Sequence, residues 1–145
     1  HINRIKSIEE ELENLSLKVH LDEPPKIINT NTDIYLVNSY GKTKSFYKEC
    51  KNVFLGGSLI KHGGQNPLEA VRYGCKVFHG PNIWNFREIY KFLKNKDLSK
   101  RIVSNHKLTS LLLSNFKKKT SHKKVIKSLN LIGKNILSKT YKEIC

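Results

Sequence analysis

A short apolar run opens into glycine at residues 52–58, NVFLGGS. A run of this length between polar residues is typical of a strand that is covered on both faces of a sheet. A helix is then predicted from Pro67 to Tyr73, ended by Gly74, and a further strand from Cys75 to Phe78. Strand, loop, helix and strand in this order predict two parallel strands joined by a crossover helix.

The same alternation extends outward from this segment to both ends of the chain. Helices are predicted where apolar residues recur every three or four positions, and strands where short apolar runs lie between polar residues. The predicted strands are 17–21, 34–37, 52–55, 75–78 and 101–103, and the predicted helices are 5–15, 43–50, 67–73, 85–93, 108–116 and 121–144. This order predicts the α/β class: a Rossmann-like, three-layer domain with a parallel sheet and helices on both faces.

Length and composition limit the class of protein. A chain of 145 residues favours one domain spanning 1–145. No apolar run approaches the roughly 20 residues that a membrane-spanning helix needs. The three cysteines are odd in number and far apart, which argues against a disulfide framework and a zinc site. The chain has no methionine and begins at His1, so we expect it to be part of a longer protein.

Positive charge is concentrated in the last third of the chain. The formal net charge is +15, yet residues 1–90 carry 12 basic and 10 acidic side chains, whereas residues 91–145 carry 15 and 2. Residues 121–145 are predicted to form a basic amphipathic helix whose apolar side carries Val125, Leu129, Ile132 and Ile136. We expect that side to pack on a protein domain. Attraction to an anionic membrane surface is a second interpretation, and nucleic-acid binding is a third that no recognition motif supports.

The loops after the predicted strands form the candidate ligand site, because open α/β sheets bind ligands beyond the carboxyl ends of their strands. The loop after residue 55 contains Gly56, Gly57, Ser58, His62, Gly63 and Gly64. Glycines allow a backbone to turn sharply or to approach a ligand closely. A helix beginning at Pro67 directs backbone amides toward a ligand, and Glu69 in its first turn suits sugar hydroxyls better than a phosphate.

Part of this loop has an explanation that needs no ligand. Asn66 and Glu69 have the spacing of a capping box, in which the two side chains bond to each other's backbone amides. Other nucleotide motifs are absent, since the sequence has neither G-x-G-x-x-G after a strand nor G-x-x-x-x-G-K-[ST]. The histidines are not spaced as zinc ligands, and Ser58 is not part of a G-x-S-x-G elbow. We therefore expect no metal site and no serine nucleophile.

Two linked segments resemble a known family. Residues 56–69, GGSLIKHGGQNPLE, and residues 80–86, GPNIWNF, closely resemble the signature of the 3-deoxy-D-manno-octulosonic acid (Kdo) transferases, GGSLxxHGGxNPLE followed by GPxxxNF. Residues 1–4, HINR, resemble the R-H-P-x-R stretch at the start of that family's second domain, and residues 39–41, SYG, fall where the family has a T-M-G-E turn. Lys42 stands where the family usually has glutamate, and Gln65 where it often has histidine. The resemblance covers essentially the whole chain.

The resemblance implies one domain of a larger enzyme. Kdo transferases are similar to GT-B glycosyltransferases, in which two Rossmann-like domains face each other across a cleft, and this chain resembles only the C-terminal one. The full-length enzyme is expected to transfer Kdo from CMP-Kdo to a lipid A precursor in lipopolysaccharide biosynthesis, with inversion, at the cytoplasmic face of the bacterial inner membrane. The N-terminal acceptor domain and the catalytic carboxylate are expected outside this chain, which alone would be inactive. No metal and no cofactor are implied, because CMP-Kdo is a substrate.

Carried over position by position, the resemblance implies donor contacts in three loops. Glu69 would hold the ribose hydroxyls, the amides around 66–68 would face the ribose and phosphate, and Tyr40 with Gly41 would border the base. The implied CMP-Kdo-binding residues are His1, Tyr40, Gly41, Lys42, Asn66, Pro67, Leu68 and Glu69. The glycine loop, with Gly56, Gly57, Ser58, His62, Gly63 and Gly64, would support them.

Two alternatives stay open at this point. The chain could be the donor domain of another GT-B enzyme that uses a different nucleotide sugar, which its nucleotide preference would reveal. It could instead be a non-catalytic basic module that binds nucleic acid or an anionic membrane. That module would bind with a steep dependence on salt and without any effect of nucleotide.

Overall fold

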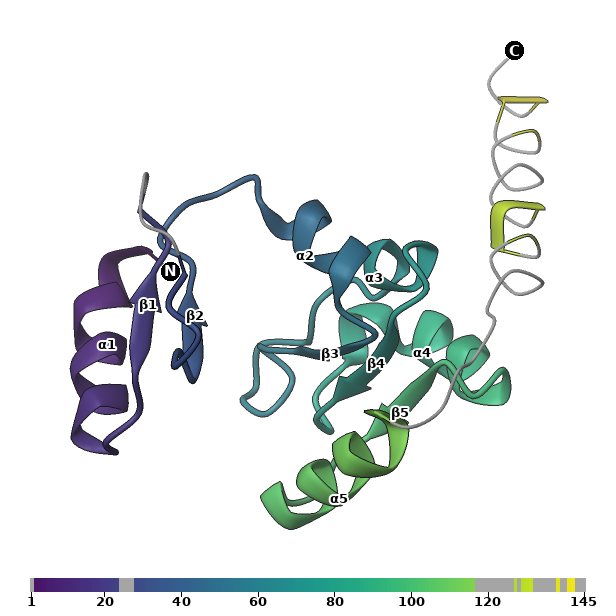
Figure 1. The fold of residues 1–145 in the computed structure, drawn as a ribbon. Helices are drawn as coiled ribbons and strands as arrows, with labels where there is room; N and C mark the ends of the chain where they lie inside the picture. Colours follow the sequence, from purple (N-terminus) through teal and green to yellow (C-terminus); the bar gives the residue numbers. More distant parts are fainter. Residues whose placement is uncertain are drawn as a thin grey trace. The chain divides into compact units, whose positions relative to one another are not determined.

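The computed structural model describes residues 2–23 and 28–116, and further along the chain residues 127, 129–131, 138, 141 and 142. The contacts within the chain divide it into two compact units, His1–Thr43 and Lys44–Cys145, and each is described by itself. Figure 1 labels the helices and strands of both units.

The first unit pairs two short strands beside one helix. Its elements are a 3-10 turn (Ile2–Arg4), α1 (Ile5–Asn14), β1 (Val19–Leu21) and β2 (Ile34–Leu36). The two strands are parallel and place His20 opposite Tyr35, whose rings stack with their centroids 5.3 Å apart. The helix predicted at 5–15 and the strands predicted at 17–21 and 34–37 are confirmed, with shorter bounds.

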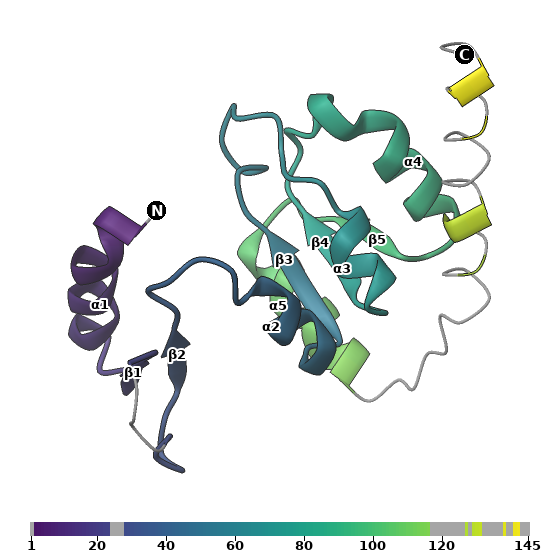
Figure 2. The same ribbon diagram turned by 90° about the horizontal axis from the view of Figure 1, so that it is seen from above.

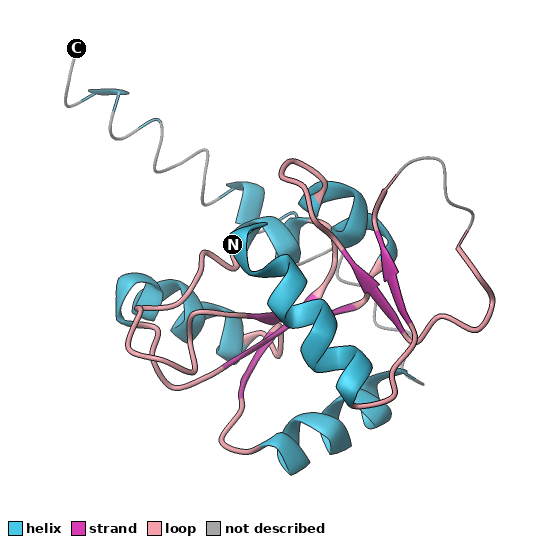
Figure 3. Cartoon of the chain, turned by 90° about the vertical axis from the view of Figure 1, so that its left-hand side faces the viewer, coloured by secondary structure: helices cyan, strands magenta, loops and turns pink. Residues whose placement is uncertain are grey.

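The second unit is built on a parallel sheet with the strand order β3-β4-β5. Its elements are α2 (Thr43–Glu49, of which Thr43 belongs to the first unit), β3 (Asn52–Leu55), α3 (Leu68–Arg72), β4 (Lys76–His79), a 3-10 turn (Trp84–Phe86), α4 (Arg87–Asn95), β5 (Ser99–Arg101) and α5 (Asn105–Phe116). The strands are only three or four residues long, and Figure 3 shows how short they are beside the helices. The α/β class with parallel strands and flanking helices is confirmed. The described strands form two separate ladders, β1-β2 and β3-β4-β5.

The central strand β4 is buried along its whole length. Val77 belongs to the same apolar cluster as Tyr90 and Leu93 of α4. Because successive side chains of a strand point to opposite faces, the fully buried Phe78 lies on the face away from that cluster. Figures 1 and 2 show α4 and α5 on opposite sides of this sheet. The sheet is therefore covered on both faces, as the apolar runs predicted.

Helix α3 ends at the glycine that the sequence indicated. Gly74 has a φ of +86°, and its amide donates to the carbonyl of Val71 at 2.9 Å, while the amide of Cys75 donates to the carbonyl of Ala70 at 3.1 Å. These two bonds form a Schellman motif, which satisfies the last carbonyls of a helix. The turn places Lys76 at the start of β4.

Several predicted bounds are wrong, and β5 shows why. This strand is Ser99–Arg101 rather than 101–103, because Ser99 is buried and its hydroxyl donates to the carbonyl of Tyr90 at 3.3 Å, whereas Val103 is 77% exposed. A hydroxyl with a backbone acceptor can be buried as readily as an apolar side chain, and an apolar pattern does not reveal that acceptor. The strand predicted at 75–78 is shifted by one residue to Lys76–His79, and the helix predicted at 85–93 is a 3-10 turn followed by Arg87–Asn95.

The predicted basic helix 121–145 lies largely outside the described residues. Those that are described, residues 127, 129–131, 138, 141 and 142, are helical. Leu129 is 8% exposed and belongs to the apolar cluster of the second unit, which confirms packing for this position. Val125, Ile132 and Ile136 lie outside the described residues. Within the described part of the chain, none of the helices combines the length and the apolar character that crossing a membrane requires.

Candidate functional site

The loops that follow β3 and β4 are joined through Ser58. Its hydroxyl donates to the carbonyl of Leu55 at 2.7 Å and accepts from the amide of Gly80 at 2.8 Å. Its carbonyl accepts from the amide of Asn82 at 2.9 Å. Ser58 is fully buried, so its hydroxyl holds two loops together and is not presented to solvent as a nucleophile.

Two glycines allow these loops to lie against each other. A Cβ atom at Gly80 would overlap the carbonyl group of Ser58. Gly63 has a φ of +92°, where side chains are strained, and a Cβ atom there would overlap the side chain of Asn85. The carbonyl of Gly63 accepts from the amide of Asn85 at 3.3 Å. Residues 56–69 and 80–86 are thus packed together beyond the carboxyl ends of two neighbouring strands, the edge where open α/β sheets bind ligands.

The segment from Asn66 to Glu69 leads from this loop into α3. Asn66 and Glu69 are exposed, Pro67 is buried, and Leu68 is half-buried. The side-chain oxygen of Asn66 accepts from the amide of Leu68 at 3.0 Å. A capping box would need Asn66 to accept from the amide of Glu69, and within the described residues neither of its two bonds is present, because Asn66 bonds to Leu68 and the N-cap of α3 is Pro67. The carboxylate of Glu69 remains at the surface of the first turn.

Tyr90 of α4 contacts the loop that contains Gln65. Its hydroxyl donates to the carbonyl of Gln65 at 3.0 Å, and the centroids of its ring and of the His79 ring are 4.2 Å apart. Burial raises the pKa of Tyr90 to about 12, so the hydroxyl stays protonated and remains a donor. The sequence did not indicate this role, because its only signal is an aromatic residue on the apolar side of a helix.

In the first unit, Lys42 is held by a residue that the sequence did not single out. Its Nζ donates to Oδ2 of Asp22 at 2.6 Å, and the hydroxyl of Tyr35 donates to Oδ1 of Asp22 at 2.6 Å. The hydrogen bond from Lys42 holds the pKa of Asp22 below its usual 3.8, and the hydrogen bond from Tyr35 has the second largest effect in the same direction. The hydrogen bond that Tyr35 donates to Asp22 raises the pKa of Tyr35, and the negative charge of Asp22 adds to this effect. Asp22 directly follows β1, and its place after a strand was the one signal that could have found it.

The structure divides the implied donor-binding residues between the two units. Tyr40, Gly41 and Lys42 follow β2 in the first unit, and Tyr40 is well exposed. Asn66, Pro67, Leu68 and Glu69 lie in the second unit together with the glycine loop. In that loop Gly57, Gly63 and Gly64 have positive φ, Gly56 does not, and His62 is exposed. His1 lies outside the described residues.

No cluster of three or more potential metal ligands from His, Cys, Asp and Glu occurs among the described residues. Two cysteines lie close together in the second unit, where the thiol of Cys75 is 3.0 Å from the carbonyl of Cys50 and 3.2 Å from that of Tyr47. Both are free thiols.

Comparison with known proteins identifies related chains, although no protein-family model matches. The chain is 32% identical over 94% of its length to the 3-deoxy-D-manno-octulosonic acid transferase of Rickettsia prowazekii, and 42% identical over 45% of its length to that of Haemophilus influenzae. It spans 31% and 15% of those two proteins, respectively, and so corresponds to less than a third of either.

A solved structure shows the same fold. It is the crystal structure of the C-terminal CMP-Kdo binding domain of WaaA from Acinetobacter baumannii, with a TM-score of 0.75 and 23% identity. The match covers 94% of this chain and 69% of the other. Because nearly the whole sequence aligns with these enzymes and the fold is that of a C-terminal domain among them, the chain belongs to the family of 3-deoxy-D-manno-octulosonic acid transferases.

Proposed function

We propose that this chain binds the CMP-Kdo donor of a glycosyltransferase, which as a whole protein transfers Kdo to a lipid A precursor in lipopolysaccharide biosynthesis. The relationship to the 3-deoxy-D-manno-octulosonic acid transferases supports the proposed transfer reaction. The proposal assigns donor binding to this chain, and it assigns acceptor binding and the catalytic carboxylate to other parts of the whole protein.

The observation that carries the proposal is the packing of the two family motifs against each other. Residues 56–69 and 80–86 are joined by the bonds of Ser58 to Gly80 and of Gly63 to Asn85. Both follow parallel strands, at the edge of the sheet where nucleotides bind in this fold class. The motifs therefore build one surface at the position that a donor requires.

Glu69 is proposed to hold the ribose hydroxyls. Its carboxylate is exposed at the start of α3, and carboxylates accept the hydrogen bonds of ribose hydroxyls in nucleotide-binding folds. The phosphate is proposed to lie near residues 66–68. Pro67 has no amide hydrogen, and the amide of Leu68 donates to the side chain of Asn66, so a phosphate would replace the Asn66 oxygen as the partner of that amide.

Tyr40 and Gly41 are proposed to border the base, and His1 and Lys42 to complete the donor site. Lys42 carries a cation where the family usually has a carboxylate, and the ammonium group is already bound to Asp22. A donor that recruits Lys42 must therefore compete with that carboxylate. We expect Lys42 to contribute less than Glu69 to donor affinity.

Calorimetric titration of the 145-residue chain with CMP, UMP and AMP tests donor binding. We expect CMP to bind most tightly, and Glu69→Ala to weaken CMP binding at least about tenfold, because a charged acceptor is lost. Glu88→Ala is the matched control, since Glu88 is an exposed acidic residue on α4. Equal affinity for the three nucleotides, or equal loss in both variants, would contradict the proposal.

The same titration separates the proposal from its nearest alternative. Another GT-B enzyme with a different nucleotide sugar would prefer the nucleotide of that sugar. A basic module without donor binding would instead bind DNA or anionic vesicles with a steep dependence on salt and would not respond to nucleotide.

Donor binding is proposed to need neither a metal nor a cofactor. Addition of EDTA is expected to leave CMP binding unchanged. Loss of binding on metal removal would contradict this proposal.

The whole protein is proposed to act at the cytoplasmic face of the bacterial inner membrane. Cell fractionation of the whole protein tests this location, which recovery in a fraction without inner membrane would contradict.

A further inference from the structure

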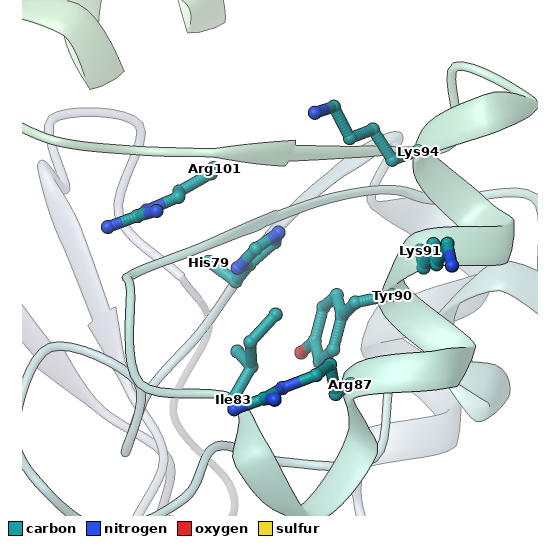
Figure 4. Close-up of a pocket in the computed structure, with 7 residues that line it drawn as sticks. All are labelled: His79, Ile83, Arg87, Tyr90, Lys91, Lys94 and Arg101. Atoms are coloured by element: carbon teal, nitrogen blue, oxygen red, sulfur yellow. The ribbon is translucent and has the colours of Figure 1, made fainter.

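A cavity of about 300 Å³ lies in the second unit where β4 and β5 end (Figure 4). Its volume is at the lower end of the range for small-ligand pockets. It is lined by His79, Ile83, Arg87, Tyr90, Lys91, Lys94 and Arg101, which we call the basic pocket. Ile83 belongs to the segment 80–86 of the proposed donor surface, and the other six residues lie outside the residues proposed for the donor.

The helix α4 supplies one wall of the basic pocket. Arg87, Lys91 and Lys94 stand at positions i, i+4 and i+7, with Tyr90 between them, so they share one side of the helix. Glu88, an acidic residue of this helix, is one residue away from Arg87 and does not line the pocket. The helix thus turns its cations toward the cavity and its carboxylate elsewhere.

The sheet supplies the opposite wall. His79 is the last residue of β4 and Arg101 the last of β5, and the two are register partners in the parallel ladder. Figure 4 shows both side chains beside the cavity. His79 is buried, and its Nδ1 lies 2.8 Å from the carbonyl of Gly80. Because a carbonyl only accepts, Nδ1 carries the hydrogen of this bond.

The charges around the cavity all have the same sign. Two arginines and two lysines line it, and no carboxylate does. In the described part of the chain no ion pair joins any of these four cations to a carboxylate. Burial, together with the charge of Arg101, lowers the pKa of His79. Long basic side chains can cover apolar surface with their stems, which accounts for basic residues lying beside Tyr90 and Ile83. It does not explain why four cations meet at one cavity without a counter-charge.

We propose that the basic pocket binds a phosphate monoester. A group with up to two negative charges and several acceptor oxygens is the ligand that a cluster of guanidinium and ammonium groups favours most. Arg87 and Arg101 have the fork geometry that binds phosphate through two hydrogen bonds, and Lys91 and Lys94 add point charges. The cavity leaves room for a small group attached to the phosphate. Its four cations are not among the donor-binding residues, and the phosphate titration is carried out without donor.

Nuclear magnetic resonance titration of the 145-residue chain with inorganic phosphate tests the proposal, with sodium chloride added to match the ionic strength. We expect saturable shifts at His79, Lys91 and Arg101 and none on α2. The double variant Arg87→Gln/Arg101→Gln should weaken phosphate binding at least about tenfold. The control Lys44→Gln/Lys48→Gln removes the same charge from exposed positions of α2 and should change the affinity by less than about twofold.

Shifts spread over all basic surfaces, equal weakening in both double variants, or shifts that never saturate would overturn the proposal. Thermal unfolding of each variant checks the fold. If the arginine variant does not fold, Lys91→Gln/Lys94→Gln replaces it, because both lysines are exposed and removing them also takes two charges from the pocket.

Two sources of the phosphate are distinguished by further titrations. Binding to phosphatidylcholine vesicles that contain phosphatidic acid, lost in the pocket variant and kept in the α2 variant, identifies a lipid headgroup. Binding of glycerol 3-phosphate with the same variant pattern, and no binding to those vesicles, identifies a soluble ester. Absence of both overturns the proposal.

Discussion

The amide of Gly80 donates a 2.8 Å hydrogen bond to the side-chain oxygen of Ser58, although the two residues are 22 positions apart. Ser58 follows β3 and Gly80 follows β4, so this one buried bond joins the loops of two neighbouring strands. Together with the bonds from Asn82 to Ser58 and from Asn85 to Gly63, it holds residues 56–69 and 80–86 against each other.

Gly80→Ala is expected to destabilise the chain strongly. The added Cβ atom would overlap the carbonyl group of Ser58, and backbone atoms cannot move aside as a flexible side chain can. We expect a loss of about 3 kcal/mol in the free energy of unfolding, measured in urea. Gly56→Ala is the control, because nothing lies within 4 Å of a Cβ atom at that position. Equal effects of the two substitutions would refute this account of the loop contact.

Ser58→Ala removes the same contact from the other side. The amide of Gly80 would then be buried without its partner, which costs about 1–3 kcal/mol of unfolding free energy. Ser45→Ala, at an exposed position of α2, should change the stability by less than about 0.5 kcal/mol. A Ser58→Ala protein as stable as the Ser45→Ala protein would show that the bond has no structural importance.

The interactions of Asp22 predict a dependence of stability on pH at both extremes. Because its folded-state pKa is lowered below 3.8, the contribution of Asp22 is complete above that value and is lost as the pH falls through the lowered pKa. Because the pKa of Tyr35 is raised above 10.0, a second contribution is complete below pH 10 and is lost as the pH rises through the raised pKa.

Asp22→Asn should therefore flatten the pH dependence of the unfolding free energy at both ends, as measured by urea denaturation across the pH range. Tyr35→Phe is the companion variant. It keeps the bond from Lys42 to Asp22, so it should flatten the alkaline side and retain most of the acid side. An unchanged acid side in Asp22→Asn would mean that Lys42 does not stabilise this carboxylate.

The neighbouring thiols Cys50 and Cys75 should differ in reactivity. Burial raises the pKa of Cys75 to about 11, so at pH 8 only about a thousandth of this thiol is ionised, and the thiolate is the reactive form. Cys50 is exposed. Iodoacetamide treatment at pH 8 followed by peptide mass spectrometry should find Cys50 modified and Cys75 intact, with both modified after unfolding in urea. Modification of Cys75 in the folded protein as fast as Cys50 would contradict its burial.

Sequence patterns predicted those parts of the molecule that depend on neighbouring residues. The strand 52–55 and the end of α3 at Gly74 were found from apolar runs and from glycine placement, which act over a few residues. The bond between Ser58 and Gly80 and the burial of Ser99 were not found, because each depends on an acceptor or donor far along the chain. Polar residues give no pattern that reveals such a partner.

The candidate site divides in the same way. The loop from Gly56 to Glu69 was recognised because its residue order is rare. The partner of Lys42 was missed, since Asp22 lies 20 residues earlier in the chain, just beyond the strand predicted at 17–21. The charge excess was assigned to the helix 121–145. That assignment stays a prediction, since the helix lies largely outside the described residues, and it did not reveal that four basic side chains of the second unit meet around one cavity.

Tyr90 touches two places at once, since its ring lines the basic pocket and its hydroxyl holds the carbonyl of Gln65, the residue before Asn66. A ligand in the pocket that moves this ring must also move or break that bond. Where the change in this bond alters the affinity of the loop for its own ligand, the loop's ligand alters the affinity of the pocket by the same factor, because the two sites share one free energy of coupling. Tyr90 would then make the two affinities a single, linked property of the protein.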